Sequence, residues 1–519
     1  MPASPILPLP APFCYNNPGM FRKILIANRG EVAIRVLRAC RELGIPSVAV
    51  YSEADRSALH TRLADQAYLL GPASPLESYL SIPRLMEVAR RSGAEAIHPG
   101  YGFLSENPAL ARACQEEGLV FIGPPAEVLE KAGNKVAARR LMKEAGLPII
   151  PGTLDVVSGE EEALEAAKEL TYPVLLKAAA GGGGKGMRLV HDEGEMGAAL
   201  RTARNEAEMA FGDSTLYVEK LIPRARHIEV QLLADAHGNA VYLGERECTI
   251  QRRHQKLVEE APSPALDPEG RRRLGEMALA GAGAMDYRSA GTFEFLRDQE
   301  GNTYFLEVNP RLQVEHPVTE MVTGIDIVKE QIRLATGEPL RFRQEDIQVK
   351  GWALECRVYA EDPENIFMPS PGTIWALEEP SGPGVRVESS AFVGLSIPTY
   401  YDPLLAKVVV WAETRLEAIS RMRRALQEYY VMGVNTTIPF HRFVVDDPTF
   451  LSGDFDTGFI HREWGEKTHK RERVKALAAL AAALVASQKG PPGAARSQSQ
   501  KVQESPWKLH GRRAQLRAT

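Results

Sequence analysis

The sequence predicts an α/β fold that opens with a doubly wound parallel sheet. Short apolar runs at residues 21–28, 47–51, 96–98 and 120–122 alternate with helical patterns, the first spanning Val32 to Cys40 and ending at Gly44. Alternation of this kind predicts a parallel sheet with helices on both faces. Further along the chain the pattern changes, first to β-hairpins and then to a mixed α/β segment.

Composition sets the broad class of the protein. A chain of 519 residues has room for three or four domains, and 44% apolar with 25% charged residues is typical of soluble globular proteins. No apolar run approaches the roughly 20 residues that a membrane span needs. The five cysteines are scattered without paired spacing, which argues against a disulfide framework or a zinc site and favours a reducing cytoplasm.

The two ends of the chain differ from its body. Residues 465–519 hold 12 Lys and Arg against 3 Asp and Glu, so of the net charge of −5 this tail carries +9 and the rest −14. An acidic body is not that of a nucleic-acid binder. Residues 1–19 are rich in proline and lack Lys and Arg, which excludes a secretory or transit signal and predicts disorder. The fold pattern begins at Phe21, so Met20 is a candidate start.

Two motifs follow the early strands. Asn28-Arg29-Gly30 is not a G-x-G-x-x-G fingerprint, so dinucleotide binding is not predicted from it. The segment HPGYGFLSEN at residues 98–107 stands at the carboxyl end of a predicted strand, where α/β proteins usually bind ligands.

A run of four glycines marks the next part of the chain. Residues 135–145 read as a helix, residues 174–177 as a strand ending in Lys177, and residues 187–190 as another strand. Between the strands lies AGGGGKGM, which lacks the Ser/Thr and glycine spacing of a Walker A loop. Four glycines cost entropy on ordering, so we expect a hairpin tip whose N–H groups close on phosphates. A flexible linker is the alternative.

Further strands are predicted at residues 216–221, 227–234, 240–243 and 353–360, and apolar helices at 274–284 and 324–335. The polar segment QRRHQK, residues 251–256, follows one of these strands. It is either a solvated surface or a cationic site for an anionic intermediate.

Residues 292–317 predict a β-hairpin with a metal site. Phe293 and Phe295 alternate with Glu294, and residues 304–311 alternate again after a turn of residues 298–302. If Arg297 and Tyr304 flank the turn, Glu294 faces Glu307, and facing carboxylates repel unless a cation lies between them. Glu294, Glu307 and Asn309 are oxygen ligands suited to Mg²⁺ with nucleotide phosphates. A solvated strand face is the alternative.

The last part is a mixed α/β segment followed by the tail. Residues 405–411 read as a strand and residues 415–429 as an amphipathic helix. Within the tail, residues 475–486 predict a short helix, residues 489–505 a Gly/Pro/Ser/Gln linker, and residues 505–513 renewed order.

Six motifs in series carry a family resemblance: ILIANRGEVAIR, HPGYGFLSEN, GGGGKGM, ERECTIQRRHQK, GTFEF and NPRLQVEHPVTEM. Over about residues 21–464 the chain resembles the biotin carboxylase family of the ATP-grasp superfamily. The resemblance implies an N-terminal domain at 20–133, an ATP-grasp domain at 134–350 with a mobile lid at about 150–222, and a C-terminal domain at 351–464. It also implies a homodimer and an ADP-forming ligase that carboxylates biotin with bicarbonate.

The resemblance assigns roles residue by residue. It places ATP phosphates at Lys135, Lys177, Gly181, Gly182, Gly183 and Gly184, adenine at Glu219 and Lys220, and the ribose and phosphates at His227, Gln251 and His254. It places two Mg²⁺, or Mn²⁺, at Glu294, Glu307 and Asn309. It places bicarbonate at Lys256, Arg311, Gln313, Val314 and Glu315, and the ureido oxygen of biotin at Arg357.

The implied chemistry fits these residue types. Arg311 can clamp bicarbonate bidentately and Glu315 can remove its proton, so that it attacks the γ-phosphoryl group to give carboxyphosphate. Carboxyphosphate yields CO₂, and Arg357 stabilises the biotin enolate that captures it. Whether phosphate, or Glu315 acting through it, deprotonates biotin stays open.

The chain lacks an Ala-Met-Lys-Met biotinylation motif, so we expect a separate biotin carboxyl carrier protein and a carboxyltransferase subunit. The acceptor is acetyl-CoA, another acyl-CoA, or pyruvate in a two-subunit pyruvate carboxylase. Alternatives are an ATP-grasp ligase that does not use biotin, such as a purine-pathway carboxylase, and a silent scaffold. QRRHQK and Arg357 count against the first. Residues 507–513 are either a docking segment for a partner or part of a solvated tail.

Overall fold

The computed structural model describes residues 19–180 and 186–465. The expectations for the N-terminal extension, for Gly181, Gly182, Gly183 and Gly184, and for the helix, linker and docking segment of the tail lie outside the described residues. Among the described helices, none is both long and apolar enough to cross a membrane.

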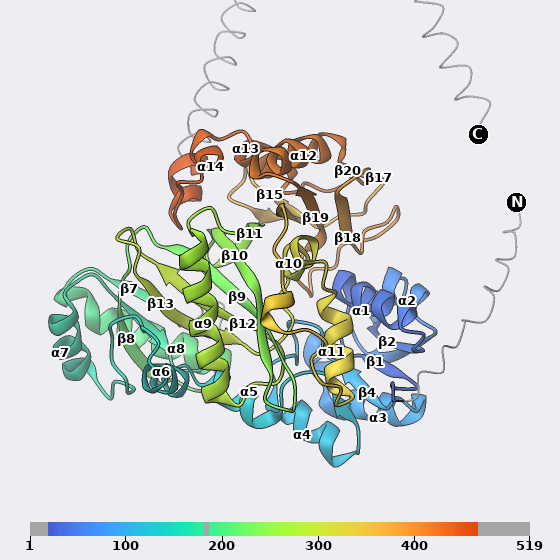
Figure 1. The fold of residues 1–519 in the computed structure, drawn as a ribbon, viewed down its shortest axis with the longest axis horizontal. Coiled ribbons are helices and arrows are strands. Elements are labelled where there is room, and N and C mark those ends of the chain that lie inside the picture. The colour runs from blue at the N-terminus through green and yellow to red at the C-terminus, as the bar shows by residue number, and fades with distance from the viewer. Residues whose placement is uncertain (1–18, 181–185, 466–519) are drawn as a thin grey trace, which may run out of the picture. The chain divides into compact units, whose positions relative to one another are not determined.

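The first part of the chain is a parallel five-stranded sheet in the order β3-β2-β1-β4-β5 (Figure 1). Its strands are β1 (Ile24–Ile26), β2 (Ser47–Ser52), β3 (Gln66–Gly71), β4 (Ala96–His98) and β5 (Val120–Phe121). Its helices are α1 (Gly30–Glu42), α2 (Leu59–Leu63), α3 (Ile82–Ser92), α4 (Pro108–Glu116) and α5 (Ala126–Gly133).

This sheet is buried on both faces, as the sequence predicted. Ile24 and Ile26 belong to one apolar core with α1, and Leu25 between them belongs to another with α3. β1 lies between β2 and β4, so Asn28 and His98 leave the sheet at the same edge. There the Asn28 amide donates to the carbonyls of Pro99 and Tyr101, both at 2.7 Å, and shapes the HPGYG turn.

A small αβ unit with its own apolar core follows. It contains α7 (Glu160–Leu170), α8 (Met196–Phe211) and the antiparallel sheet β7-β6-β8, formed by β6 (Val174–Ala178), β7 (Arg188–Val190) and β8 (Leu216–Lys220). β6 and β7 pair as the hairpin expected around the glycine run, whose tip is not among the described residues. This unit falls within the segment for which the resemblance predicts a lid.

The centre of the molecule is an antiparallel eight-stranded sheet in the order β13-β12-β9-β10-β11-β14-β19-β18. Its strands are β9 (Arg226–Ala234), β10 (Ala240–Arg252), β11 (Gln255–Ala261), β12 (Ser289–Arg297), β13 (Thr303–Asn309), β14 (Trp352–Tyr359), β18 (Val385–Ser389) and β19 (Leu404–Ala412). The sheet is continuous across residue 350, where the sequence predicted a domain boundary, because β11 pairs with β14.

Helices cover both faces of this sheet. α9 (Pro268–Met285) crosses β9 and β10 with α6 (Lys135–Glu144) beside it (Figure 1). On the other face, α10 (His316–Thr323) packs on β10, β11, β14 and β19, with α11 (Ile327–Ala335) following it. The remaining elements are α12 (Arg415–Glu428), α13 (Ile438–Val444), α14 (Pro448–Ser452), β15 (Glu361–Asp362), β16 (Met368–Pro369), β17 (Ala376–Glu378) and β20 (Tyr430–Met432).

The β12–β13 hairpin shows how register decides which side chains meet. Glu294 faces Glu307, as predicted, but Arg297 faces Thr303 rather than Tyr304. A bulge between Glu294 and Phe295 shifts the pairing register by one residue. The strict alternation expected of residues 304–311 therefore does not hold. Phe305 packs in the core with Phe293 and Phe295. Only because of this bulge does Glu307 face Glu294.

Candidate active site

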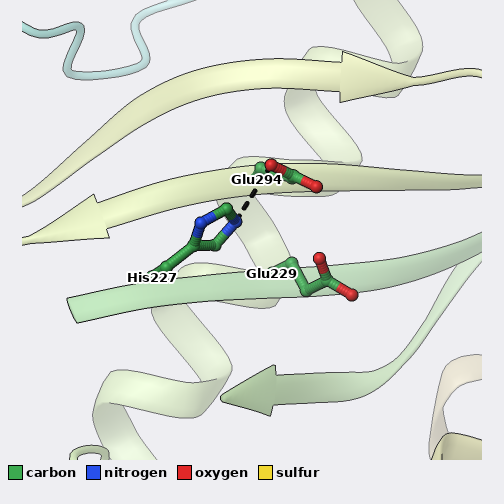
Figure 2. Close-up of side chains that lie close together, drawn as sticks. All are labelled: His227, Glu229 and Glu294. Carbon is green, nitrogen blue, oxygen red and sulfur yellow. Dashed lines mark ion pairs between the residues drawn. The ribbon is translucent and has the colours of Figure 1, made fainter. Parts of the chain in front are cut away.

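Three carboxylates form a row across adjacent strands. Glu229 of β9 faces Glu294 of β12, and Glu294 in turn faces Glu307 of β13. Figure 2 shows Glu229 and Glu294 with His227, which lies on the same strand as Glu229. Glu229 and Glu294 are buried, and like charges this close repel each other strongly in the protein interior. The row therefore requires positive charge close by.

Cations from β9 itself and from two other segments supply that charge. The Lys256 ammonium, at the start of β11, lies 2.5 Å from Glu229 and 2.9 Å from Glu294. The His227 ring lies 2.9 Å from Glu294, the ion pair drawn in Figure 2, and Lys135 of α6 lies 2.8 Å from Glu307. Burial opposes ionisation of Glu294, but Lys256 and His227 hold the pKa of its carboxyl below the usual range.

Glu315 lies between two cations at the N-terminus of α10. One carboxylate oxygen is 2.7 Å from the Lys256 ammonium and the other 2.9 Å from the Arg357 guanidinium of β14. Burial works against the charged form, but Lys256 and Arg357 hold the pKa of Glu315 well below its ordinary value. Glu315 is therefore an ionised carboxylate at neutral pH, with one oxygen toward the metal-site acids and one toward Arg357.

Arg311 follows β13 and is fixed by acceptors on several sides. It donates to the Asn309 side chain at 3.0 Å, to the Gln313 side chain at 2.7 Å and to Glu106 at 2.5 Å. Glu106 belongs to the HPGYGFLSEN motif, so the hydrogen bond joins two motifs far apart in the sequence. Gln313 also donates to Glu294 at 3.1 Å, which couples Arg311 to the carboxylate row.

The predicted nucleotide residues meet between α6 and the small αβ unit. Lys177 at the end of β6 forms an ion pair with the buried Glu219 of β8, which also binds Arg139 of α6. The Glu219 side chain is thus held by two cations. Lys220 donates to the Leu170 carbonyl at 2.8 Å and to Thr171, so its side chain points to α7.

QRRHQK forms the turn of the β10–β11 hairpin. Gln251, the last but one residue of β10, lies near His227, with 3.5 Å between the amide and ring nitrogens. Arg253 and His254 take positive φ values of 48° and 67° at the tip. Partial desolvation, together with Lys177 and His227, lowers the pKa of His254. The hairpin therefore brings Gln251, His254 and Lys256 toward one site.

The residues predicted to bind metal suit Mg²⁺. Glu294 and Glu307 face each other, and the Asn309 amide donates to Glu294 at 2.8 Å, so three oxygen-bearing side chains lie together. Magnesium in nucleotide sites is typically held by one or two carboxylates together with substrate phosphates. His227, Glu229 and Glu294 form another close group of possible ligands. The oxygen set fits a metal that binds phosphate better than this group, which includes an imidazole nitrogen.

Several residues of this site were missed in the sequence. Glu229, Arg139 and Glu106 each contact a predicted residue, and Arg246 is fully buried against Glu229. One signal was available. His227, Glu229 and Gln231 alternate with apolar residues in HIEVQLLA, which places three polar side chains on one face of a strand. The contacts of Arg139 and Glu106 come from distant segments and leave no local pattern.

Three family models match the chain in series. Residues 20–129 match the biotin carboxylase N-terminal domain, residues 134–343 the ATP-binding domain of the carbamoyl-phosphate synthase L chain, and residues 355–462 the biotin carboxylase C-terminal domain.

Curated proteins and solved structures agree with these models. A pyruvate carboxylase subunit of Methanothermobacter thermautotrophicus is 54% identical, covering 85% of this chain and 90% of that protein. Biotin carboxylase 1 of Bacillus subtilis is 52% identical, covering 85% and 98%. The biotin carboxylase domain dimer of Hydrogenobacter thermophilus 2-oxoglutarate carboxylase, solved with MgADP, ADP and bicarbonate, is 51% identical, covering 85% and 97% with a TM-score of 0.84.

Proposed function

This chain belongs to the biotin carboxylase family, and from that premise we propose that it carboxylates biotin on a separate carrier protein, using ATP and bicarbonate. The reaction forms carboxyphosphate and ADP, and the CO₂ released from carboxyphosphate is captured by biotin. We assign the same roles to the residues that the sequence singled out, within domains bounded near residues 133, 350 and 464.

The observation that carries this proposal is the position of Glu315. Its carboxylate contacts Lys256 on one side and Arg357 on the other, at 2.7 and 2.9 Å. Lys256 also contacts Glu294 of the metal-site row, while Arg357 stands apart from that row on β14. The ionised Glu315 carboxylate thus lies between the residues assigned to ATP and bicarbonate and the arginine assigned to biotin. A two-step carboxylation requires the two reactions to take place side by side in this way.

For the first step, Arg311 binds bicarbonate. Its guanidinium is held by Asn309, Gln313 and Glu106, so a bicarbonate ion has to replace Glu106 or bind beside it. Glu315 takes the bicarbonate proton, and the freed oxygen attacks the γ-phosphoryl group, breaking its bond to ADP. Lys135 and Lys177 neutralise charge on the phosphates. Glu294, Glu307 and Asn309 would hold Mg²⁺, which supplies further neutralisation of that charge when bound.

For the second step, Arg357 faces the ureido oxygen of biotin. The N1′ proton passes to the phosphate formed from carboxyphosphate, or to Glu315 through it. This places negative charge on the ureido oxygen, and a fixed guanidinium stabilises it. The nitrogen then forms a bond to the carbon of CO₂. Arg357 is buried and tied to Glu259 and Glu315, so its position is set before biotin arrives.

Two assays on two variants test these roles. Arg357→Ala should cut biotin-dependent carboxylation about a hundredfold or more, because the enolate loses a preorganised donor. The slow bicarbonate-dependent ATPase without biotin should change far less. Arg311→Ala should damage both activities, since it binds bicarbonate. Both rates are measured with free biotin as acceptor.

Equal losses in the two assays for Arg357→Ala would show that this residue serves ATP or the fold, and its assignment to biotin would be withdrawn. Arg423→Ala is a matched control, because Arg423 is a partly exposed arginine of α12 whose ion pair is with Asp446. Absence of any biotin-stimulated ATP cleavage in the unchanged protein would instead support a scaffold.

We further propose that the final acceptor is an acyl-CoA, with the acetyl-CoA carboxylase of fatty acid synthesis as the first candidate. A two-subunit carboxylase of a 2-oxo acid is the second candidate, favoured by the 54% identity to the archaeal pyruvate carboxylase subunit. The cytoplasm is the expected compartment, since the described cysteines are free and buried. Purifying the native complex and assaying its transferase with acetyl-CoA, propionyl-CoA and pyruvate separates the candidates.

We also propose a homodimer, supported by the dimer described for the Hydrogenobacter thermophilus relative. Light scattering coupled to size-exclusion chromatography should give twice the chain mass of 57.0 kDa. A monomer at micromolar concentration would contradict the proposed state.

A further inference from the structure

We propose that Glu355 is held as a neutral carboxylic acid that shares its proton with the Glu259 carboxylate, and that this pair positions Arg357. The proposal deepens the function above, on which its catalytic consequence depends. Glu355 lies on β14, two residues before Arg357, and is fully buried. Sequence reasoning gave it no role.

The sheet register places the two carboxyl groups together. Glu259 of β11 faces Glu355 of β14, so their side chains leave the sheet on the same face. Facing Cβ atoms on paired strands lie about 5 Å apart, within reach of a hydrogen bond between two glutamates. Both oxygens of Glu355 and one oxygen of Glu259 are buried without a hydrogen-bond partner among the residues that the structure describes. One proton between the two groups supplies the missing hydrogen bond.

The balance of charge also requires a proton here. The buried acids around the site on this face are Glu31, Glu229, Glu259, Glu294, Glu315 and Glu355. Glu388 of β18, on the same face, has its own partners in Arg38 and Arg386. The cationic partners of the acids around the site are Lys256, Arg246, Arg357 and Lys407, with His227 beside Glu294. Glu355 is the acid in this set for which the described residues provide no ion pair. A buried carboxylate without a partner costs several kcal/mol, and the usual outcome is that it keeps its proton.

On balance, the surroundings of both carboxyl groups favour the protonated form. Burial, Glu259 and Glu315 raise the pKa of Glu355 well above its ordinary value, although Lys407 of β19 and Arg357 oppose the shift. Burial, opposed by Arg357 and reinforced by Glu315, raises the pKa of Glu259 to about 7. The other charged or titratable groups on this face include His316 of α10, Glu31 of α1, Lys256, Cys248 and Tyr359 of β14.

The consequence falls on Arg357. Its guanidinium lies 2.5 Å from Glu259 and 2.9 Å from Glu315, so two carboxylates fix its direction. Were Glu355 ionised, it would repel Glu259 and compete for the same guanidinium. A neutral Glu355 instead donates to Glu259 and leaves it a single negative charge with which to hold Arg357. Glu355 is thus a positioning residue that acts through Glu259, without contact with substrate.

Infrared difference spectroscopy tests the protonation state directly. The unchanged protein at neutral pH should show the carbonyl stretching band of a protonated carboxyl group, and Glu355→Gln should remove it. Glu378→Gln, an exposed change on β17, is the matched control and should keep the band. A band that survives in Glu355→Gln overturns the proposal. Should that variant fail to fold, the absence of any such band in the unchanged protein between about pH 6 and pH 8 overturns it.

Kinetics test the positioning role. Glu355→Gln mimics the neutral acid and should keep biotin-dependent carboxylation within about threefold, whereas Glu355→Ala should lower it about tenfold or more. Glu259→Gln should lower it at least as much, with a smaller effect on the ATPase measured without biotin. Loss of both activities to the same extent in Glu355→Ala and Glu355→Gln overturns the role. If the unchanged protein shows no biotin-dependent activity, the proposed function fails, while the infrared result still decides the carboxyl pair.

Discussion

At the scale of single residues, the site is a set of buried charges that compensate one another. Each acid of the row pairs with at least one cation. Lys256 pairs with two of these acids, Glu229 and Glu294, and also with Glu315. Removing one partner of a buried pair leaves the other uncompensated, which is more costly than losing a surface ion pair. Effects of substitution here are therefore expected to reach beyond the residue that is changed.

Glu307→Gln should lower ATP cleavage about a hundredfold or more while the fold stays intact, because charge developing on the phosphoryl group loses metal-bound stabilisation. Glu294→Gln should act in the same direction. Steady-state ATPase at ordinary Mg²⁺ measures both, with circular dichroism to check folding. Glu300→Gln, in the exposed turn of the same hairpin, is the control. Near-normal turnover in both site variants would refute the ligand assignment.

The pH dependence of stability offers a second test of Glu355. A carboxyl whose pKa is raised by folding binds its proton more tightly in the native state, so stability falls as pH rises from the unfolded pKa of 4.5 to the folded value. Glu355→Gln removes this proton, so its stability relative to the unchanged protein should grow by about 1.4 kcal/mol per pH unit in that window. Unfolding midpoints at several pH values measure the difference. A constant difference across the window would mean that Glu355 titrates normally.

At the scale of elements, local backbone geometry decides which side chains meet. The irregularity between Glu294 and Phe295 brings Glu307 opposite Glu294, and the tight β10–β11 turn brings Gln251 back across from Lys256. The small αβ unit depends on a glycine at its entrance. Gly186 has φ +67°, and a Cβ there would lie 3.0 Å from the Ala178 methyl and 3.3 Å from that of Ala207.

Gly186→Ala should therefore destabilise this unit and raise the KM for ATP. Gly212→Ala is a matched control, because Gly212 has φ +69° but no atom within 4 Å of the added methyl. Positive φ alone costs about 1 kcal/mol, and crowding adds to it only at Gly186. Thermal unfolding and ATP saturation curves measure the two effects. If the two variants show the same loss of stability and the same KM for ATP, the residues around Gly186 accommodate the added methyl group without cost.

At the scale of the whole molecule, buried ion pairs join the first sheet to the active-site helix. Arg35 of α1 lies 2.9 Å from Glu320 of α10 and 2.6 Å from Asp326, which caps α11. Glu315 directly precedes α10, and Glu320, which contacts Arg35, lies in its last turn. The N-terminal domain therefore holds one end of the helix whose other end carries the proposed base.

Arg35→Ala should destabilise the protein by about 3 to 5 kcal/mol, because Glu320 and Asp326 lose a buried partner. It should also lower carboxylation by moving Glu315. Arg272→Ala, which breaks an exposed pair on α9, should change stability little, because solvent screens that pair. Chemical denaturation compares the two variants. A small effect of Arg35→Ala would mean that Arg386, also bound to Glu320, suffices to hold α10.

The sequence by itself determined the parallel sheet and the hairpins, and it predicted many of the residues that the structure brings together at the candidate site. Strand–helix alternation fixes the N-terminal fold, and alternation around Glu294 together with turn residues 298–302 fixes a hairpin that holds two acids. The sequence pattern underestimated the length of β10, which was expected at residues 240–243 but continues to Arg252. Glu245, Arg246 and Glu247 lie beyond the expected strand, and they are buried because partners elsewhere in the chain compensate their charges.

Only the tertiary structure decided which charges meet. Glu106 and Arg311 stand 205 positions apart in the chain and Arg139 and Glu219 80 apart, and no local pattern reports such contacts. The same holds for Glu259 and Glu355, which meet because β11 pairs with β14 in one register. Local periodicity reflects the backbone geometry of each element, whereas the energy of a buried charge depends on every group within a few ångströms, and those groups come from distant parts of the chain.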